Sequence, residues 1–262
     1  MAELTVLGSS GAWPEAGRAC SAFLVRDGGA RIVLDLGYGV LPRLLALCPD
    51  GEVDAVVITH EHPDHCVDVS GLARVRHYHA AGRPRVPLYC TAGVLDVLRA
   101  AEPTIDPESV FDVHVVHGRD SWRVGEHVEV TTVPVPHHVP AVGVRLSGPS
   151  ATIAYTGDSG PADALVELGA DADLFVMEAT LTEPDPGEVP RLLTAGQAAE
   201  LAERAGAATL MLTHFWPGAD RETAVREACA VFSGDVLAAE EGHTLTLQRP
   251  VQPQSSLRLD GT

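Results

Sequence analysis

Three histidines and one aspartate lie within six consecutive residues, His60-Glu61-His62-Pro63-Asp64-His65. This stretch follows an apolar run, residues 55–59, that is typical of a buried strand. Imidazoles and a carboxylate beside a buried strand cost free energy unless something compensates them, and a transition metal does so. Histidine nitrogens and carboxylate oxygens are also common ligands of zinc. The stretch therefore predicts a metal site.

The spacing within this stretch favours two adjacent metals over one. His60 and His62 are two residues apart, so their side chains leave the same side of an extended chain. Asp64 and His65 come where the chain is expected to turn into a helix, so they can face a second point nearby. A lone histidine is more often structural or exposed, but three with an aspartate in this order are far rarer by chance.

Five apolar, strand-like runs in the chain, that before His60 included, each end in a single polar residue. The residues at these ends are Asp35, His60, Asp158, Glu178 and His214. Near-continuous apolar strands indicate a sheet that is covered on both faces. Open α/β sheets bind their ligands at the carboxyl ends of the strands. The five endings therefore predict one common site.

Helices are expected between these strands. A capping box at Thr194 begins an alanine-rich helix that stops at Gly206, and Asp220 can cap a second helix. Pro161 and Gly169 bracket a short third helix.

The pattern of these elements predicts an α/β fold, and more exactly a four-layer αββα sandwich. Further strands are expected over residues 3–7, 21–26, 86–90, 128–134 and 142–146. The chain falls into two similar halves joined near residues 118–125. We expect one domain over residues 1–247 and a polar C-terminal tail over residues 248–262.

Composition limits the location and the partners of the chain. No apolar run approaches the roughly 18 residues of a membrane span, and the N-terminus lacks the features of a signal peptide. The five cysteines form no C-x-x-C pair, which favours reduced thiols and a cytoplasmic protein without a membrane partner. A net charge of −18 disfavours a nucleic acid polymer. A small-molecule substrate is expected, and the protein partner considered is a second copy in a homodimer.

The residues resemble the metallo-β-lactamase fold superfamily over nearly the whole chain. The H-x-H-x-D-H motif of that superfamily matches His60, His62, Asp64 and His65. His137, Asp158 and His214 resemble the metal ligands that come later in the sequences of that superfamily. The resemblance implies that one metal binds His60, His62 and His137. It implies that the other binds Asp64, His65 and His214, with Asp158 between the two.

Three details resemble the ribonuclease Z-like branch of the superfamily. They are residues 7–11, the Val-Pro-Ala stretch after His137, and Met177-Glu178-Ala179-Thr180. In two respects the chain departs from the branch. Leu192 stands where a catalytic histidine is usual, and only twenty residues separate His137 from Asp158, too few for a tRNA-gripping arm. The chain looks more like the small bacterial phosphodiesterases of the branch, some of which act on cyclic nucleotides.

The resemblance implies a dinuclear metal-dependent hydrolase with two divalent ions, zinc first and manganese or iron as alternatives. A hydroxide that bridges the metals would attack a cyclic nucleotide or another small phosphodiester. The catalytic candidates are Asp64, which is also a ligand, and His138 and Glu178 as proton donors to the leaving oxygen. Asp35 is expected to orient a ligating imidazole.

Several alternatives stay open at this point. The same metals would also serve to hydrolyse a lactone, a thioester or a lactam. A ribonuclease Z-like RNA nuclease, a redox diiron protein and a non-catalytic metal-binding module rank lower. In a rival assignment of the ligands, His138 binds the metal in place of His137, and Glu178 holds a ligand or a loop in place.

Overall fold

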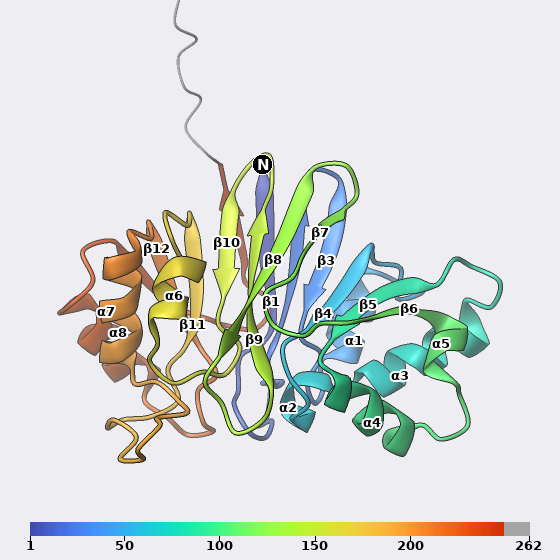
Figure 1. Cartoon of the computed structure of the whole chain (residues 1–262), viewed down its shortest axis with the longest axis horizontal. Helices are drawn as coiled ribbons and strands as arrows, with labels where there is room; N and C mark the ends of the chain where they lie inside the picture. Colours follow the sequence, from blue (N-terminus) through green and yellow to red (C-terminus); the bar gives the residue numbers. More distant parts are fainter. Residues whose placement is uncertain (249–262) are drawn as a thin grey trace, which may run out of the picture.

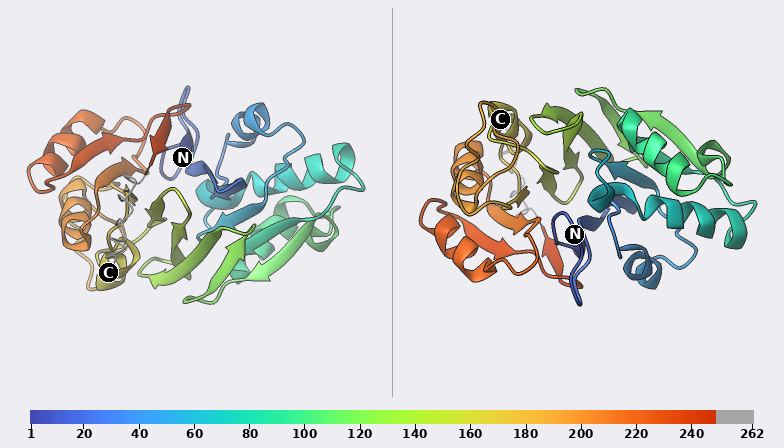
Figure 2. Two further views of the ribbon diagram at one scale, coloured as in Figure 1. Left: turned by 90° about the horizontal axis from the view of Figure 1, so that it is seen from above. Right: turned by 90° about the horizontal axis from the view of Figure 1, so that it is seen from below.

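The computed structural model describes residues 1–248, which form two sheets packed face to face. Helices cover the outer face of each sheet, with α6–α8 on one side and α1–α5 on the other (Figure 1). The views from above and below show the same layers (Figure 2). This arrangement confirms the predicted αββα sandwich. All but the first residue of the predicted tail, residues 248–262, lies outside the described part, and one domain over residues 1–247 stays a prediction.

The first sheet has the strand order β14-β1-β2-β3-β4-β5-β6. Its strands are β1 (Ala2–Gly8), β2 (Ala22–Asp27), β3 (Ala30–Leu34), β4 (Ala55–Ile58), β5 (Val86–Cys90), β6 (Phe111–Val115) and β14 (Thr244–Leu247). Its helices are α1 (Leu41–Leu47), α2 (Pro63–Cys66), α3 (Val69–Arg74), the π-helical turn η1 (Val75–His79), α4 (Ala92–Ala101) and α5 (Pro107–Val110). The pairs from β14 to β3 are antiparallel, and those from β3 to β6 are parallel.

The second sheet repeats this plan with the order β13-β12-β11-β10-β9-β8-β7. Its strands are β7 (Ser121–Val124), β8 (Val128–Val135), β9 (Ala141–Ser147), β10 (Thr152–Tyr155), β11 (Leu174–Glu178), β12 (Thr209–Thr213) and β13 (Asp235–Ala238). Its helices are α6 (Asp163–Leu168), α7 (Ala195–Ala205) and α8 (Arg221–Cys229). The pairs from β7 to β10 are antiparallel, and those from β10 to β13 are parallel.

Apolar side chains from both sheets form the central layer of the core. Phe23 of β2 and Tyr155 of β10 meet there edge to face, with ring centroids 5.2 Å apart. Separate apolar clusters pack each sheet against its own helices. Both faces of the central strands are therefore covered, which is why these strands read as continuous apolar runs.

The helix signals in the sequence are confirmed. Thr194 and Gln197 form the capping box of α7, and Gly206 ends that helix with φ +69°. The Asp220 side chain accepts a hydrogen bond from the backbone of Thr223 at the start of α8. α6 lies between Pro161 and Gly169, as predicted.

The boundary between the two halves lies near the junction that the sequence predicted. The chain leaves the first sheet after β6 and enters the second at β7, so β7 itself occupies half of the predicted junction, residues 118–125. The halves are also interlocked, because the last described strand, β14, returns to the first sheet and pairs with β1. Within residues 1–248, no helix is long and apolar enough to cross a membrane.

Candidate metal centre

The predicted ligands gather at one edge of the sandwich, where α2 lies in the lower centre of Figure 1. The short turn of α2 follows β4 and carries Asp64 and His65, as the sequence suggested. The loops that follow strand ends supply the remaining five, namely His60, His62, His137, Asp158 and His214. The structure thus brings together all seven residues that the sequence singled out as ligands.

The first cluster consists of three imidazoles that converge on one point. His62 Nδ1 lies 3.1 Å from His60 Nε2 and 3.0 Å from His137 Nε2. His60 is fully buried, whereas His62 is half-buried and lies on the solvent side of the cluster. His137 takes part in this cluster and His138 does not, so the geometry supports the first assignment of the ligands over its rival.

The second cluster combines a carboxylate with two imidazoles. Asp64 Oδ2 lies 3.2 Å from His214 Nε2 and 3.7 Å from His65 Nε2. All three side chains are buried. This set is more enclosed than the first and carries a negative charge of its own.

Asp158 lies between the clusters and turns one oxygen toward each. Its Oδ1 is 3.1 Å from His65 Nε2 and 3.2 Å from His214 Nε2. Its Oδ2 is 3.9 Å from His60 Nε2 and 3.7 Å from His137 Nε2. One carboxylate can therefore contribute to both clusters.

Two atoms at the heart of this arrangement test whether the residues fit a cation. His65 Nε2 and Asp158 Oδ1 are buried, and neither makes a hydrogen bond within the described residues. The two atoms lie 3.1 Å from each other, close enough for one cation to bind both. Together with the imidazole and carboxylate donors around them, they fit two divalent ions.

Asp35 fixes the orientation of the His65 ring through a hydrogen bond from Nδ1, the nitrogen that faces away from the cluster. Its Oδ2 accepts a hydrogen bond from His65 Nδ1 at 2.7 Å and another from the Tyr155 hydroxyl at 2.8 Å. The backbone N–H and the hydroxyl of Thr59 also donate to this carboxylate. Because Nδ1 of His65 donates to Asp35, Nε2 is the nitrogen that faces the cluster and can bind a cation once it has lost its proton. The position agrees with the role expected for Asp35.

Glu178 supports His214 in a similar way, through a hydroxyl. The carboxylate accepts hydrogen bonds from Ser159 N at 2.7 Å and Thr180 Oγ1 at 2.5 Å, and Thr180 Oγ1 lies 2.7 Å from His214 Nδ1. Thr180 Oγ1 thus joins Glu178 to Nδ1 of His214, and this contact directs Nε2 of the same ring to the cluster. Burial, reinforced by the charge of Asp158, raises the pKa of Glu178 to about 8.

A side-chain hydroxyl holds His60 of the first cluster, and backbone carbonyls hold His137. Thr59 Oγ1 lies 3.0 Å from His60 Nδ1. The Arg191 carbonyl oxygen accepts from His137 Nδ1 at 3.1 Å, while the Arg191 guanidinium donates to the His137 carbonyl. Sequence reasoning missed Arg191, Thr180 and Tyr155, because each is distant in sequence from the side chain that it holds.

The two clusters differ in the pKa of their histidines. Burial lowers the pKa of His60 well below its usual value and that of His137 to about 4. Burial acts on His65 in the same direction, but the charges of Asp158 and Asp35 outweigh it and raise the pKa of His65 well above its usual value. The pKa of His214 is also raised, because Asp158 and Asp64 outweigh its burial.

The remaining catalytic candidate, His138, is exposed beside the first cluster. Its ring centroid lies 5.1 Å from that of His137. Of the three catalytic candidates, His138 is therefore the one that a substrate can meet from solvent. Asp64 and Glu178 are buried, with Glu178 behind His214.

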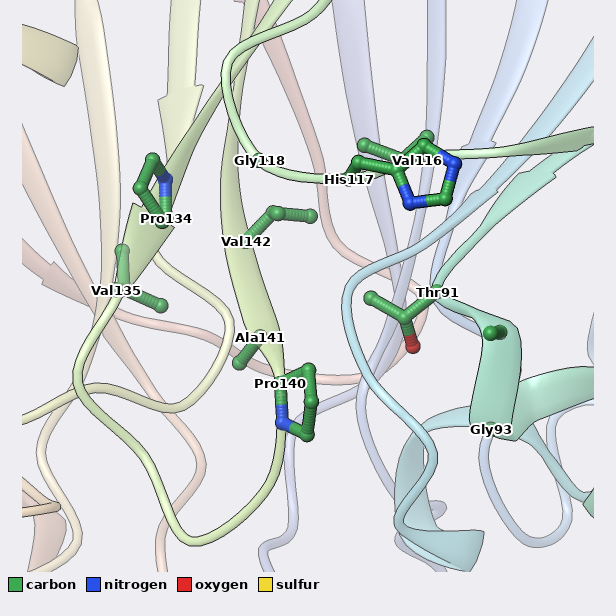
Figure 3. A pocket seen from close by; sticks show the side chains of 11 residues that line it. Thr91, Gly93, Val116, His117, Gly118, Pro134, Val135, Pro140, Ala141 and Val142 are labelled. Carbon is green, nitrogen blue, oxygen red and sulfur yellow. The ribbon is translucent and has the colours of Figure 1, made fainter.

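A mostly apolar pocket of about 340 Å³ lies between the start of α4 and the start of β9 (Figure 3). Thr91 at the start of α4 forms one wall, and Pro140 and Val142 form the facing wall. Val142 N donates to the Thr59 carbonyl at 3.1 Å, which joins this wall to the end of β4. None of the seven candidate ligands lines the pocket, so the pocket adjoins the metal centre and is separate from it.

Comparison with known proteins places the chain in a family. Residues 30–215 match the model of the beta-lactamase superfamily domain. An uncharacterised protein of Mycobacterium leprae is 36% identical, with 94% of this chain and 89% of that protein aligned. The chain therefore belongs to the β-lactamase superfamily, and it has the fold and donor set of a metal-dependent hydrolase.

Two further relatives carry more specific names. The metallo-β-lactamase fold protein YhfI from Bacillus subtilis has a crystal structure that matches with a TM-score of 0.83 and 25% identity, covering 93% of this chain and 98% of that one. A ribonuclease Z of Mycolicibacterium gilvum is 31% identical over 83% of this chain and 85% of its own length.

Proposed function

We propose that the chain is a dinuclear metal-dependent phosphodiesterase that acts on small phosphodiesters. The observation that carries the proposal is the pair of facing clusters, with one oxygen of Asp158 turned toward each. Two divalent ions held there, zinc first and manganese or iron as alternatives, would activate water and neutralise the charge that develops on a phosphoryl group. The seven donors provide their positions.

The choice of a phosphoester rests on the relatives and on local sequence. A ribonuclease Z, whose name states that it cleaves RNA, is 31% identical to the chain. The stretch Glu178-Ala179-Thr180 resembles the same branch, and here it forms the hydrogen-bond chain behind His214. These details favour phosphorus over a carboxylic carbon as the reacting atom.

The choice of a small substrate rests on the segment between His137 and Asp158. β9, β10 and the short turn between them occupy most of this segment, so the described chain has no additional arm there. The net charge of −18 repels a long polyanion. A cyclic nucleotide or another small phosphodiester fits both observations.

His138 is the residue that we assign to proton transfer. As the bond from phosphorus to the leaving oxygen breaks and a new bond to a water oxygen forms, the leaving alkoxide needs a proton. His138 is exposed beside His137 and can donate one from a ring N–H. Asp64 then serves as a ligand. Glu178, held behind Thr180, positions His214 in place of donating to substrate.

A substrate panel on the zinc-loaded protein tests this proposal. The panel compares bis-p-nitrophenyl phosphate, a cyclic nucleotide, a lactone and a thioester, and the metal content is measured on the same sample. We expect close to two ions per chain and turnover of the phosphodiesters. Turnover confined to the lactone or the thioester would replace the proposal with its carboxylic alternative, and a folded protein that binds no metal would reject both.

A further inference from the structure

Two tryptophans at the rim of the second cluster are left largely exposed. Trp13 is 52% exposed and Trp216 is 44% exposed, and their ring centroids lie 6.3 Å apart with a tilt of 37°. We propose that this pair is an aromatic platform that stacks against a planar ring, a nucleobase, carried by the substrate. The inference rests on the proposed phosphodiesterase function and names the group that its substrate bears.

The loop that carries Trp13 packs directly on the second cluster. Ala12 N donates to Asp64 Oδ2 at 2.7 Å. A Cβ on Gly11 would lie 2.7 Å from the His214 ring, so only glycine allows so close an approach. Trp13 directly follows Ala12. One Cα–Cα step of about 3.8 Å therefore keeps the Trp13 backbone within about 8 Å of the Asp64 carboxylate.

A second loop, which follows β12, carries Trp216 to the same rim. Trp216 lies two residues after His214, and the intervening Phe215 is buried beneath the Arg221 guanidinium. Phe215 N donates to the Ser9 carbonyl at 3.1 Å, and Gly11 N donates to the Phe215 carbonyl at 2.9 Å. These two bonds join the loops, so both indoles are presented by backbone that is tied to metal-ligand positions.

The backbone at Ala12 is strained in a way that fits a functional loop. Ala12 has φ +60°, a left-handed conformation that a residue with a Cβ rarely adopts. Strain of this kind persists where the surrounding structure holds it and is concentrated at functional sites. Here the turn carries the chain from the Asp64 contact to Trp13 at the surface.

Charge on the Trp13 loop favours a neutral ring over a second phosphate. Arg18 follows on the same loop, but it is paired with Glu15 at 3.4 Å and with Glu241 at 3.1 Å. Its charge is therefore compensated by two carboxylates. A flat uncharged group gains from the two exposed indole faces, since base–aromatic stacking needs only a π-face.

The test compares two ligands that differ only in the base. Adenosine 5′-monophosphate and ribose 5-phosphate share the sugar and the phosphate, and neither contains a phosphodiester to be cleaved. Binding to the zinc-loaded protein is measured by calorimetry and by tryptophan fluorescence, which reports on the platform because it holds two of the three tryptophans of the chain. The variants are Trp13→Ala, Trp216→Ala and the corresponding changes to Phe.

We expect each change to alanine to weaken binding of adenosine 5′-monophosphate about 5- to 100-fold and that of ribose 5-phosphate little. Phenylalanine should restore most of the affinity, and the metal content should not change. Tyr78→Ala is the matched control, because Tyr78 is an aromatic residue on η1 with 63% exposure. Equal losses for the two ligands, or no loss for either, would overturn the platform.

The result separates this inference from the proposed function. If the variants discriminate between the two ligands although the panel shows no phosphodiester hydrolysis, the platform stands and the activity falls. If phosphodiesters are hydrolysed and the variants bind both ligands as the unmodified protein does, the platform alone is wrong.

Discussion

The two metal clusters share Asp158 yet differ in charge and in access to solvent. Apart from the shared Asp158, the first cluster consists of imidazoles only, and its His62 is half-buried. The second contains the Asp64 carboxylate and is enclosed, with the buried carboxylates of Asp35 and Glu178 behind it. The two halves of the fold repeat one plan and both contribute residues to each cluster, yet the two clusters differ.

The difference in charge determines how many protons each cluster must release when it binds an ion. In the first cluster the pKa of His60 and of His137 is lowered, so these imidazoles are neutral at pH 7 and ready to bind. In the second cluster the pKa of His65 and of His214 is raised. A cation there has to displace protons. The histidines of the enclosed second cluster therefore bind protons through the nearby carboxylates, whereas those of the open first cluster are neutral and already positioned for an ion.

The largest effect is expected where the two clusters meet. Asp158→Asn removes the one charge that faces both clusters, so metal content should fall below two ions per chain. Hydrolysis should fall on the order of 10³-fold or more, beyond the 10–100-fold that the loss of an outer-shell partner costs. Elemental analysis and kcat on the same preparation measure both. Two retained ions with kcat within about tenfold of the parent would contradict the shared role.

Asp27→Asn is the matched control for this change. Asp27 is also a buried carboxylate, at 6% exposed, but it accepts hydrogen bonds from backbone N–H groups of Gly28 and Ser150. Its loss should lower the free energy of unfolding without changing the metal content. The comparison separates the loss of any buried carboxylate from the loss of this one.

The pKa difference predicts that zinc binding releases more protons from the second cluster than from the first. His62→Ala disables the first cluster and His214→Ala the second, so each variant isolates the other. Because the pKa of His65 and that of His214 are raised, these side chains hold protons that zinc must displace, and the number released per ion should exceed that at the first cluster. Calorimetry at pH 7 in buffers of different ionisation enthalpy counts these protons.

The sign of the pH dependence follows from the same shifts. As the pH falls below 7, zinc affinity should drop first at the second cluster, by up to about tenfold per pH unit for each proton displaced. The first cluster should keep its zinc until the pH approaches about 4, where His137 itself is protonated. Equal proton release from the two variants would remove the distinction between the clusters.

The sequence was sufficient to predict that the candidate ligands gather, because most of them follow an apolar strand, whereas His137 was assigned from the family resemblance. The motif from His60 to His65 and the endings at Asp158 and His214 could be located from the apolar runs of β4, β10 and β12. β7 was missed because only one of its four residues is buried, so its sequence lacks an apolar run.

The partners that hold the ligands could not be predicted in the same way. Tyr155 is 120 residues from Asp35 and reaches it from the other sheet. Arg191 is 54 residues from His137 and acts through its backbone carbonyl, which every residue type has. Contacts of this kind depend on how the sheets face each other, and local pattern does not encode that.

Asp35→Asn should affect the second cluster more than the first, which Asp35 reaches only through the Thr59 hydroxyl. An amide cannot accept all the hydrogen bonds that the carboxylate takes from His65, Thr59 and Tyr155. We expect zinc affinity at the second cluster to fall roughly 10–100-fold, the usual effect of losing an outer-shell carboxylate. Zinc titration in the His62→Ala background, which isolates that cluster, measures the change. An equal loss in the His214→Ala background would show that the clusters are not supported separately.

The smallest effect is expected at Arg191, and its size tests how the open cluster is held. Arg191→Ala keeps the carbonyl that accepts from His137 Nδ1 and removes only the guanidinium that donates to the His137 backbone. One net hydrogen bond is worth about 0.5–1.5 kcal/mol, so zinc affinity at the first cluster should fall only about 2- to 12-fold. Arg204→Ala, which breaks an exposed pair with Asp163, is the control. A loss as large as that of Asp35→Asn would mean that the open cluster also depends on charge, because the backbone contact to His137 survives the substitution.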